Sequence, residues 1–460
     1  MTRRTARILV GVALVLGVGG FAAYRSSWVR SLFGREAENA AEMARLTDTK
    51  LEVFPVSASA DWPQWRGPFR DGRAPAGSFR TDWEANPPKR LWSAPCGGGY
   101  SSFAVVDGRL YTQDFENGSE RILCLDAATG QSLWDYHYPA DYSNFKSGYA
   151  SGPRATPTVV GNRLYAVGAV GKFLCLDMPK ESGAPPHLLW EHDLMKEFGA
   201  APPRWGVACS PLIEGEQAIV QPGGKGGSVA AFNRDNGDLK WKAGTNPAGY
   251  SSPIAATAGG QRLIYAFAGD ALLCIRAADG ELLDKYPWTT QYDANIATPI
   301  VVDDYVFISS AYSKGCALLR VQPAGDRVKL QEVYARSNRV LRSHHSTAVF
   351  RDGFLYGFDG TGRTLPQCVD FRKGTAVPDW GDGARLESGT AILADKHLIV
   401  LSENGDLWLI EARPDEFNPV ATLRSVVKGS ELWALPVLAG GRLYLRGSRE
   451  IISLDVHGGD

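Results

Sequence analysis

The sequence lacks a charge excess of either sign and has no long basic run. Its formal net charge is −1, with 49 Lys and Arg residues against 50 Asp and Glu residues. Electrostatic capture of nucleic acid depends on clustered Lys and Arg, so this function is not expected. The chain does not lack apolar residues: 44 % are hydrophobic and 22 % are charged, a composition typical of a folded protein rather than a disordered one.

Paired cysteine motifs are also missing. The chain has seven cysteines, and no two are adjacent or in a CxxC spacing, which argues against a zinc site and a redox motif. They are Cys96, Cys124, Cys175, Cys209, Cys274, Cys316 and Cys368. Cys124, Cys175 and Cys274 recur at one position of an apolar segment, where we interpret them as small buried residues. Pairing of a few cysteines in an oxidising compartment stays open as the alternative.

Motifs for phosphate and metal sites are absent too. The glycine-rich run at 222–228 (PGGKGGS) lacks the GxxxxGK[ST] spacing, so it predicts a hairpin with Lys225 as a candidate ligand contact. No segment has the spacing of a calcium loop, and no metal site is expected. His344-His345 is the only adjacent histidine pair, and in a strand the two side chains point to opposite sides. A structural hydrogen-bonding role is favoured there over a single general base.

The only long apolar run lies at the N-terminus. Residues 8–24 are uncharged, follow Arg3, Arg4 and Arg7, and end before Arg25. The run is long enough to span a membrane, so an uncleaved signal anchor is favoured over a cleaved signal peptide. We expect a single-pass protein of the cell membrane with the bulk of the chain on the periplasmic side.

This reading divides the chain into three parts. Residues 1–34 form the signal anchor, residues 35–60 form a linker with a short exposed helix and a flexible spacer, and residues 61–460 form the globular part. The linker is expected to hold the globular part off the membrane.

A repeat dominates the globular part. Each copy has an apolar strand, a turn such as Asp107-Gly108, a strand containing LY, a strand resembling LCLD, a turn resembling AATG, and a strand ending in LW. Equivalent positions in the eight copies are 42 to 54 residues apart: Phe103, Pro157, Pro211, Pro253, Pro299, Ala348, Ala391 and Pro436. Four short strands in such a period are typical of one blade of a β-propeller. The fold class is therefore all-β.

The ends of the repeat predict how the ring closes. The eighth copy stops after its third strand, at Val456, and a strand ending in LW precedes the first copy at residues 89–92. An N-terminal strand that completes the last blade would remove the exposed sheet edges. The sequence therefore predicts an eight-bladed propeller with an N-terminal membrane helix outside it.

Several strings carry a family resemblance. The string LCLDAATGQSLW (123–134) resembles the repeats of quinoprotein alcohol dehydrogenases and of the BamB-like propellers of the outer-membrane assembly machinery. The strings DWPQWRGPFRDG (61–72) and GPRATPTVVGNRLY (152–165) are similar to strings of exported bacterial PQQ-repeat propellers. The resemblance covers residues 61 to about 456. It implies a binding or scaffolding module with a protein or polymer partner in the cell envelope, or alternatively a PQQ-dependent dehydrogenase of an alcohol or sugar.

The sequence departs from the dehydrogenase pattern. Such enzymes typically hold PQQ with calcium, and many have an adjacent cysteine pair over the cofactor, which is missing here. No matching set of calcium ligands can be placed, so no cofactor is assigned and PQQ with calcium remains the alternative. The tryptophans that end blades, at 92, 134, 190, 241 and 380, are interpreted as blade-to-blade packing; Asp284 replaces the tryptophan in the fourth copy.

Candidate binding residues lie in the segments that lead into the innermost strands, because those segments converge on one channel mouth. They are Arg154, Trp205, Tyr250, Asn295, His344 and Trp433. Arg154 and Trp205 are the strongest candidates, since a guanidinium and an indole together suit an anionic planar ligand. The alternative is that these polar residues bind water and cap strand ends.

Overall fold

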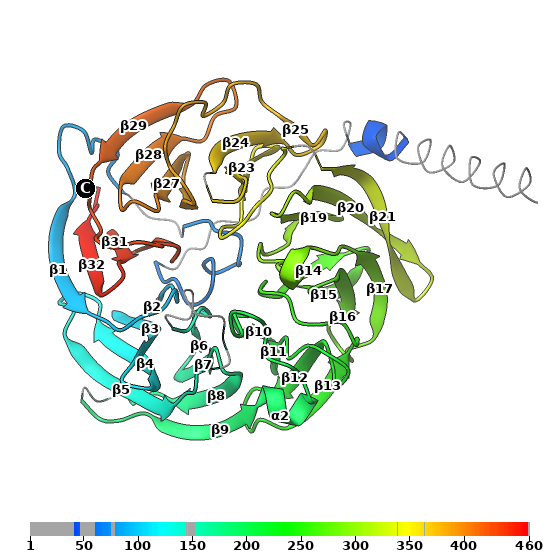
Figure 1. Ribbon diagram of the computed structural model, residues 1–460, viewed down its shortest axis with the longest axis horizontal. Helices are drawn as coiled ribbons and strands as arrows, with labels where there is room; N and C mark the ends of the chain where they lie inside the picture. Colours follow the sequence, from blue (N-terminus) through cyan, green and yellow to red (C-terminus); the bar gives the residue numbers. More distant parts are fainter. Residues whose placement is uncertain are drawn as a thin grey trace, which may run out of the picture.

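The computed structural model of the protein describes residues 41–46, 60–74, 79–143, 145, 152–179, 181, 183–337, 339–362 and 364–458. Within these ranges the chain forms eight four-stranded antiparallel sheets around a central axis (Figure 1). The predicted all-β, eight-bladed propeller is confirmed.

Each repeat of the sequence forms one blade, and the blades are numbered 1 to 8 in chain order. The strands of each blade are given from the axis outward. Blade 1 consists of β2 (Ala104–Val106), β3 (Arg109–Glu116), β4 (Ser119–Asp126) and β5 (Ser132–Pro139), and blade 2 of β6 (Thr158–Val160), β7 (Arg163–Val167), β8 (Lys172–Asp177) and β9 (His187–Asp193). Blade 3 consists of β10 (Leu212–Glu214), β11 (Gln217–Val220), β12 (Val229–Asn233) and β13 (Leu239–Ala243), and blade 4 of β14 (Ile254–Ala258), β15 (Gln261–Phe267), β16 (Ala271–Arg276) and β17 (Leu282–Pro287). The short helices α2 (Leu194–Phe198) and η1 (Gln291–Asp293) lie between blades.

The other four blades complete the ring. Blade 5 consists of β18 (Ile300–Val302), β19 (Tyr305–Ser310), β20 (Gly315–Ala324) and β21 (Arg327–Arg336), and blade 6 of β22 (Val349–Arg351), β23 (Phe354–Asp359), β24 (Leu365–Asp370) and β25 (Thr375–Ala376). Blade 7 consists of β26 (Thr390–Ala394), β27 (His397–Leu401), β28 (Leu407–Glu411) and β29 (Asn418–Leu423), and blade 8 of β30 (Val437–Ala439), β31 (Arg442–Arg446), β32 (Glu450–Asp455) and β1 (Lys89–Pro95).

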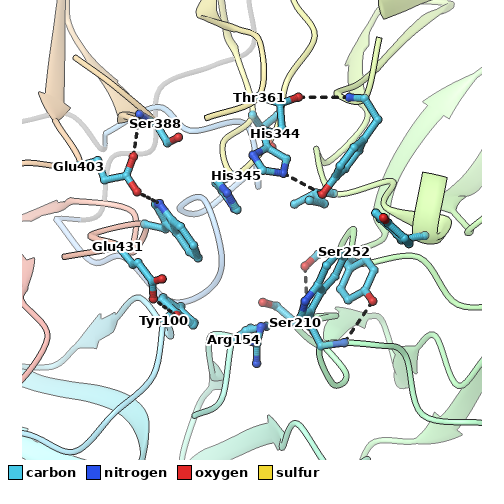
Figure 2. Close-up of a pocket in the computed structure, with 18 of the residues that line it drawn as sticks. Tyr100, Arg154, Ser210, Ser252, His344, His345, Thr361, Ser388, Glu403 and Glu431 are labelled. Carbon is cyan, nitrogen blue, oxygen red and sulfur yellow. Dashed lines mark hydrogen bonds between the residues drawn. The ribbon is translucent and has the colours of Figure 1, made fainter. Parts of the chain in front are cut away.

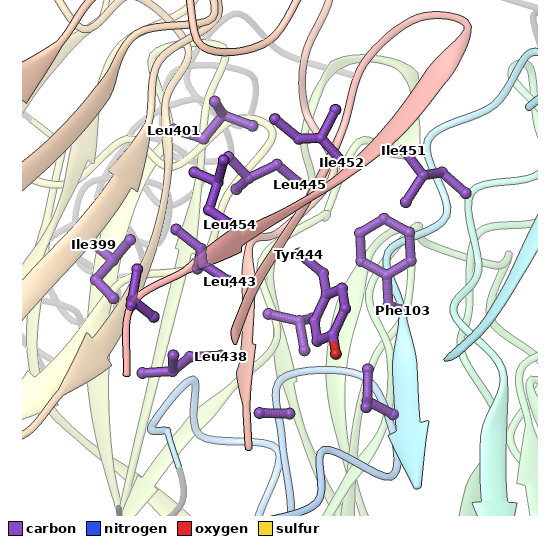
Figure 3. Packing of buried hydrophobic residues seen from close by; sticks show 14 of the residues in the cluster. Phe103, Ile399, Leu401, Leu438, Leu443, Tyr444, Leu445, Ile451, Ile452 and Leu454 are labelled. Atoms are coloured by element: carbon purple, nitrogen blue, oxygen red, sulfur yellow. The ribbon is translucent and has the colours of Figure 1, made fainter. Parts of the chain in front are cut away.

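Blade 8 is closed by the N-terminal strand, as predicted. Strand β1 pairs antiparallel with β32, and the register places Trp92 opposite Ser453 and Pro95 opposite Glu450. Apolar side chains of blades 7, 8 and 1 then share one buried cluster, in which Ile399, Leu443 and Phe103 are all inaccessible to solvent (Figure 3). The seam of the ring is therefore closed by a continuous buried apolar cluster.

The tryptophans near the ends of blades pack against the next blade, which confirms that interpretation. The indole of Trp92 lies against Gly130, and that of Trp190 lies against Gly237; its Nε1 also donates to the Arg234 carbonyl at 3.2 Å. Both glycines have a left-handed φ, +74° and +80°, at the turn before the outermost strand. A side chain there would be strained and would also collide with the indole.

Asp284 makes a different blade contact in place of tryptophan. Its Oδ2 accepts a hydrogen bond of 2.7 Å from the backbone N–H of Leu330 in β21 of the next blade. Arg327 of the same strand donates back to the carbonyls of Leu282 and Leu283. Polar contacts between two outermost strands thus take the place of a packed tryptophan at this junction.

All seven cysteines are buried and none forms a disulfide. Cys124, Cys175 and Cys274 lie directly opposite a tyrosine of the neighbouring strand, Tyr111 in the case of Cys124. Burial raises the pKa of the Cys175 thiol to about 12. These side chains behave as small core residues, as expected.

Residues 61–74 cross the centre of the ring and form a plug (Figure 1). Trp62 pairs with Val105 of β2, the Pro63 carbonyl accepts from the Val159 N–H of β6, and Arg73 pairs in parallel with Leu393 of β26. The plug therefore bonds to inner strands on both sides of the axis. The sequence showed this segment only as part of a resemblance and did not predict its position.

Two buried arginines fasten the plug. Arg66 is 1 % exposed and donates to the carbonyls of Thr347 and Ala348 in blade 6, at 3.1 and 3.0 Å. Arg70 is 2 % exposed and donates to the carbonyls of Ser210 and Pro211 in blade 3, at 3.0 and 2.9 Å. A guanidinium has five donors, so each side chain satisfies several inner-strand carbonyls at once.

Residues 41–46 form a helical segment that is docked on the propeller, whereas the sequence predicted an exposed helix. Glu42 accepts from Tyr305 and forms a 2.8 Å ion pair with Arg320, both in blade 5. Leu46 is fully buried, and its carbonyl accepts from Arg372 after β24 of blade 6. An amphipathic helix with a buried leucine and a paired glutamate gains more from the blade surface than from solvent.

The predicted membrane segment at residues 8–24 lies outside the described residues. None of the helices within the described ranges has the length and hydropathy that a membrane span requires. Membrane anchoring therefore stays a prediction from the sequence.

Candidate functional site

A cavity of about 540 Å³ opens at one end of the central channel, and all eight blades contribute to its wall. Two kinds of segment meet there. Segments that lead into the inner strands supply Arg154 and Trp205, and segments that follow the second strands supply Tyr312 and Glu403. Because first and second strands are antiparallel, both kinds of segment reach the same mouth. Figure 2 shows the side chains arranged around an open centre.

The structure brings five of the six predicted residues into this cavity. Arg154, Trp205, Tyr250, His344 and Trp433 line it. Their binding role stays a prediction, but their convergence follows from the ring geometry.

Asn295 is placed differently. It is fully buried, and its Nδ2 donates to the carbonyls of Ala268 at 2.7 Å and Trp288 at 3.0 Å. Its Oδ1 accepts from Ser310 at 2.7 Å. All of its polar atoms thus join strand ends of blades 4 and 5, and the side chain does not line the cavity. Asn295 therefore caps strand ends, which is the alternative to ligand binding given in the sequence analysis.

One side of the cavity is a stack of flat groups. The guanidinium of Arg154 lies 5.2 Å from the Tyr100 ring centroid, and Tyr100 stacks on Trp433 at 5.0 Å. Trp433 is also parallel to His345 at 3.8 Å, and His345 contacts His344 at 3.7 Å. We call these five side chains the stacked wall. They come from blades 1, 2, 6 and 8, so the wall is built from parts of the chain far apart in sequence.

Two glutamates hold the stacked wall by its edges. Glu403 Oε1 accepts from Trp433 Nε1 at 3.0 Å, and its Oε2 accepts from the Ser388 N–H at 3.2 Å. Glu431 Oε2 accepts from the Tyr100 hydroxyl at 2.6 Å (Figure 2). Trp433 is therefore held by two stacking partners and a charged acceptor, so its ring forms a fixed part of the cavity wall.

The other aromatic rings of the cavity wall meet at steep angles. Tyr292 contacts Trp205 with planes 81° apart and Tyr312 with planes 86° apart. Trp205 in turn contacts Tyr250, whose hydroxyl accepts from the Trp205 N–H at 3.3 Å. The exposed Arg204 lies 4.5 Å from the Tyr292 centroid at the rim. We call Trp205, Tyr250, Tyr292 and Tyr312 the angled wall.

Burial sets the protonation of the histidines. It lowers the pKa of His344 to about 4, and burial with the nearby His344 and Arg154 lowers the pKa of His345 well below its usual value. Both imidazoles are therefore neutral at pH 7. His344 Nε2 lies 3.1 Å from the Tyr312 hydroxyl, while its buried Nδ1 has no hydrogen-bond partner among the described residues. Burial also lowers the pKa of Arg154, which stays a cation.

The plug supplies the inner end of the cavity. Trp65 lines it, and Trp65 Nε1 donates to Thr298 Oγ1 at 2.9 Å. On the other side of the plug a second cavity of about 530 Å³ is lined by Arg66, Phe69 and the far ends of inner strands. The plug thus divides the channel, and the site cavity is blind.

Sequence reasoning missed Glu403, Glu431, Tyr292, Tyr312 and Trp65. Glu403 and Tyr312 follow second strands, so a search limited to the segments before the inner strands could not include them. The antiparallel pairing within each repeat was the signal that could have found them. Trp65 carried no such signal, because the plug does not belong to the repeat.

The family relationship now rests on fold and sequence together. The family described as outer membrane protein assembly factor BamB matches residues 119–374, more than half of the chain. The chain belongs to this family of PQQ-repeat propellers. The comparison with curated proteins found no match.

Two solved structures of low identity share the fold of this PQQ-repeat propeller. BamB from Moraxella catarrhalis is 12 % identical, with 81 % of this chain and 99 % of that chain covered and a TM-score of 0.52. Sqt1 from Saccharomyces cerevisiae is 11 % identical over 81 % and 98 %, also with 0.52. Quinohemoprotein alcohol dehydrogenase from Comamonas testosteroni is 11 % identical over 93 % and 85 %, with 0.48. At such identities the likeness shows the fold alone.

The cavity of this PQQ-repeat propeller does not fit PQQ with calcium. Calcium takes six to eight oxygen ligands, whereas the carboxylates that line the cavity, Glu403 and Glu431, accept hydrogen bonds from separate parts of the stacked wall. The described residues contain no group of three side chains of the metal-binding types. The several carboxylates of PQQ would face two glutamates and one lining cation, Arg154.

Proposed function

We propose that this propeller is a binding module of the cell envelope, tethered to the membrane by its N-terminal segment, and that the cavity is where it holds a protein or polymer partner. One observation carries the proposal: the cavity is a preformed, blind pocket whose aromatic and charged side chains are already fixed by stacking and hydrogen bonds. Its volume lies within the range of about 300–1,000 Å³ typical of ligand sites.

The docked helix leaves the cavity open to a partner. Glu42 contacts Tyr305, which begins β19 directly after the β18–β19 turn. That turn lies at the end of β18 remote from its leading segment, and therefore remote from the cavity. None of residues 41–46 lines the cavity.

A retention assay tests the binding site. The purified full-length protein in detergent is immobilised, and solubilised envelope material is passed over it. Arg154→Ala should abolish retention of a cavity ligand, because it removes the cationic end of the stacked wall, while the Tm stays within a few degrees. Arg424→Ala, an exposed arginine over Trp408, is the matched control. Equal retention by wild type and Arg154→Ala would contradict the proposal.

The topology has its own test. A reporter that functions only outside the cytoplasm should be active when it is fused to the C-terminus. If only a reporter that functions in the cytoplasm is active there, the periplasmic placement is contradicted.

A PQQ-dependent dehydrogenase remains the second candidate function, because the chain resembles PQQ-repeat enzymes. An absorption titration with PQQ and Ca²⁺ separates it from the binding module. We expect no binding at micromolar cofactor, because the donor set does not form a calcium site. Saturable binding that is lost in Glu403→Gln would favour the enzyme instead.

A further inference from the structure

The cavity and its surroundings carry charges of both signs. Glu403 and Glu431 are the carboxylates that line it, Arg154 is a cation in the wall, and Arg204 is a cation at the rim beside Tyr292. The two histidines add no charge at neutral pH. An anionic ligand would meet both glutamates and a cationic ligand would meet both arginines, so the set favours a ligand without net charge.

The angled wall offers an apolar surface to such a ligand. Tyr292 lines the cavity and is 43 % exposed, more than the other two tyrosines of the angled wall. Its near-perpendicular contacts with Trp205 and Tyr312 hold the ring upright at the mouth. A flat ring with C–H bonds on one side can pack on it, as apolar groups do on aromatic faces.

The stacked wall and the two glutamates that hold it offer polar groups to such a ligand. The carboxylate oxygens of Glu403 and Glu431 accept hydrogen bonds, and the guanidinium of Arg154 donates them. A ligand that carries several hydroxyl groups supplies both donors and acceptors to these groups.

We propose that the cavity binds the terminal residue of an uncharged glycan, with one face of the sugar ring on Tyr292 and its hydroxyl groups toward the stacked wall. This proposal rests on the proposed function, because it names the ligand of the same site. The terminal residue is specified by the plug. Trp65 closes the inner end of the cavity, so a polymer can enter by an end but cannot thread the channel.

The test uses the same retention assay with two variants matched in exposure. Tyr292 is 43 % exposed at the mouth, and Phe69 is 44 % exposed in the second cavity on the other side of the plug. Tyr292→Asn keeps a residue that tolerates the left-handed φ of 64° at this position. We expect Tyr292→Asn to weaken retention about tenfold, and Phe69→Asn to leave it within about twofold.

The envelope material is treated in parallel with periodate, which cleaves vicinal diols of sugars, or with proteinase. Retention that needs Tyr292, is lost after periodate and survives proteinase supports the proposal. Prior extraction with organic solvent then separates a lipid-linked glycan from a free polysaccharide. A choline-conjugated resin and an oligogalacturonate resin replace the envelope material as cationic and anionic probes, and neither should bind.

The outcomes separate this proposal from the proposed function. Retention that needs Tyr292 and Arg154 but survives periodate overturns the glycan and leaves a protein ligand in the cavity. Binding of choline or oligogalacturonate in a Tyr292-dependent manner also overturns the uncharged ligand. Retention that is unchanged in both Tyr292→Asn and Arg154→Ala overturns the cavity as the binding site, and with it both proposals.

Discussion

The imidazole of His345 lies parallel to the indole of Trp433, with ring centroids 3.8 Å apart and planes 6° apart. Tyr100 stacks on the same indole at 5.0 Å, so the indole is held between neighbours from blades 1 and 6. A protonated imidazole in this place would add a buried cation near Arg154. The stack therefore depends on the neutral form of the histidine.

Stability should fall in mild acid because of this arrangement. Burial lowers the pKa of His344 to about 4, against about 6.5 in the unfolded chain. Between these values the unfolded state binds more protons, so the contribution is complete above pH 6.5 and is lost as the pH falls toward 4. His344→Asn should flatten the fall of Tm between pH 7 and pH 4.5. The control His187→Asn, at an exposed residue of β9, should leave the slope unchanged; equal slopes in all three proteins would contradict the prediction.

Gly130 and Gly118 provide a matched test of the blade contact. Both have a left-handed φ, +74° and +76°, but a Cβ at Gly130 would lie 2.5 Å from the Trp92 ring, while a Cβ at Gly118 would meet nothing within 4 Å. Each alanine substitution carries a conformational cost of about 1–2 kcal/mol. Gly130→Ala should cost about 1–3 kcal/mol more, the usual range for overpacking. Denaturant unfolding measures the difference, and equal losses would show that the indole gives way freely.

Arg66 should be the strongest single fastening of the plug. Arg66→Leu leaves the Thr347 and Ala348 carbonyls without their buried donors, which costs about 1–3 kcal/mol for each unsatisfied group. Limited proteolysis should then cleave within residues 60–74, which wild type protects. Arg424→Leu, whose side chain is 66 % exposed, should change neither stability nor cleavage. A plug that stays protected in Arg66→Leu would assign the fastening to Arg70 and Trp65.

Truncations should separate the plug from the ring-closing strand. Deletion of residues 1–84 removes the plug and keeps β1, and this variant should keep the oligomeric state of the wild type. Deletion of residues 1–95 also removes β1 and exposes the edge of β32, so it should form oligomers or aggregates. Light scattering after size-exclusion chromatography distinguishes the two. A monomeric 1–95 deletion would mean that the edge of β32 is covered by other residues.

The repeat predicted most of the fold and part of the site. The eight inner strands and the pairing of residues 89–92 with the last blade follow from a local pattern that recurs, so they were visible in the sequence. The convergence of Arg154, Trp205 and Trp433 followed from their equivalent repeat positions. Asn295 occupied such a position too, but its amide meets strand ends of its own neighbourhood, which only the coordinates of Ala268 and Trp288 reveal.

The plug and the docked helix could not be predicted in the same way. Arg66 and Arg70 bond to carbonyls 140 to 282 residues away, and an arginine in a polar segment carries no sign that it will be buried. Glu42 likewise looked like a solvent-exposed residue of a charged helix until Arg320 and Tyr305 were placed beside it. Contacts outside the repeat have no period, and periodicity was the source of the other predictions.

The pairing of β1 with β32 also sets an order of events during biosynthesis. Strand β1 is made early, but its partner begins 361 residues later, at Glu450. At ribosomal speeds of about 5–20 residues per second, the first strand waits roughly 20–70 s for the last blade. Seven blades can form from neighbouring segments during that time, while an apolar edge stays open at each end of the arc. The nascent chain is thus most exposed to misassembly just before β32 is complete.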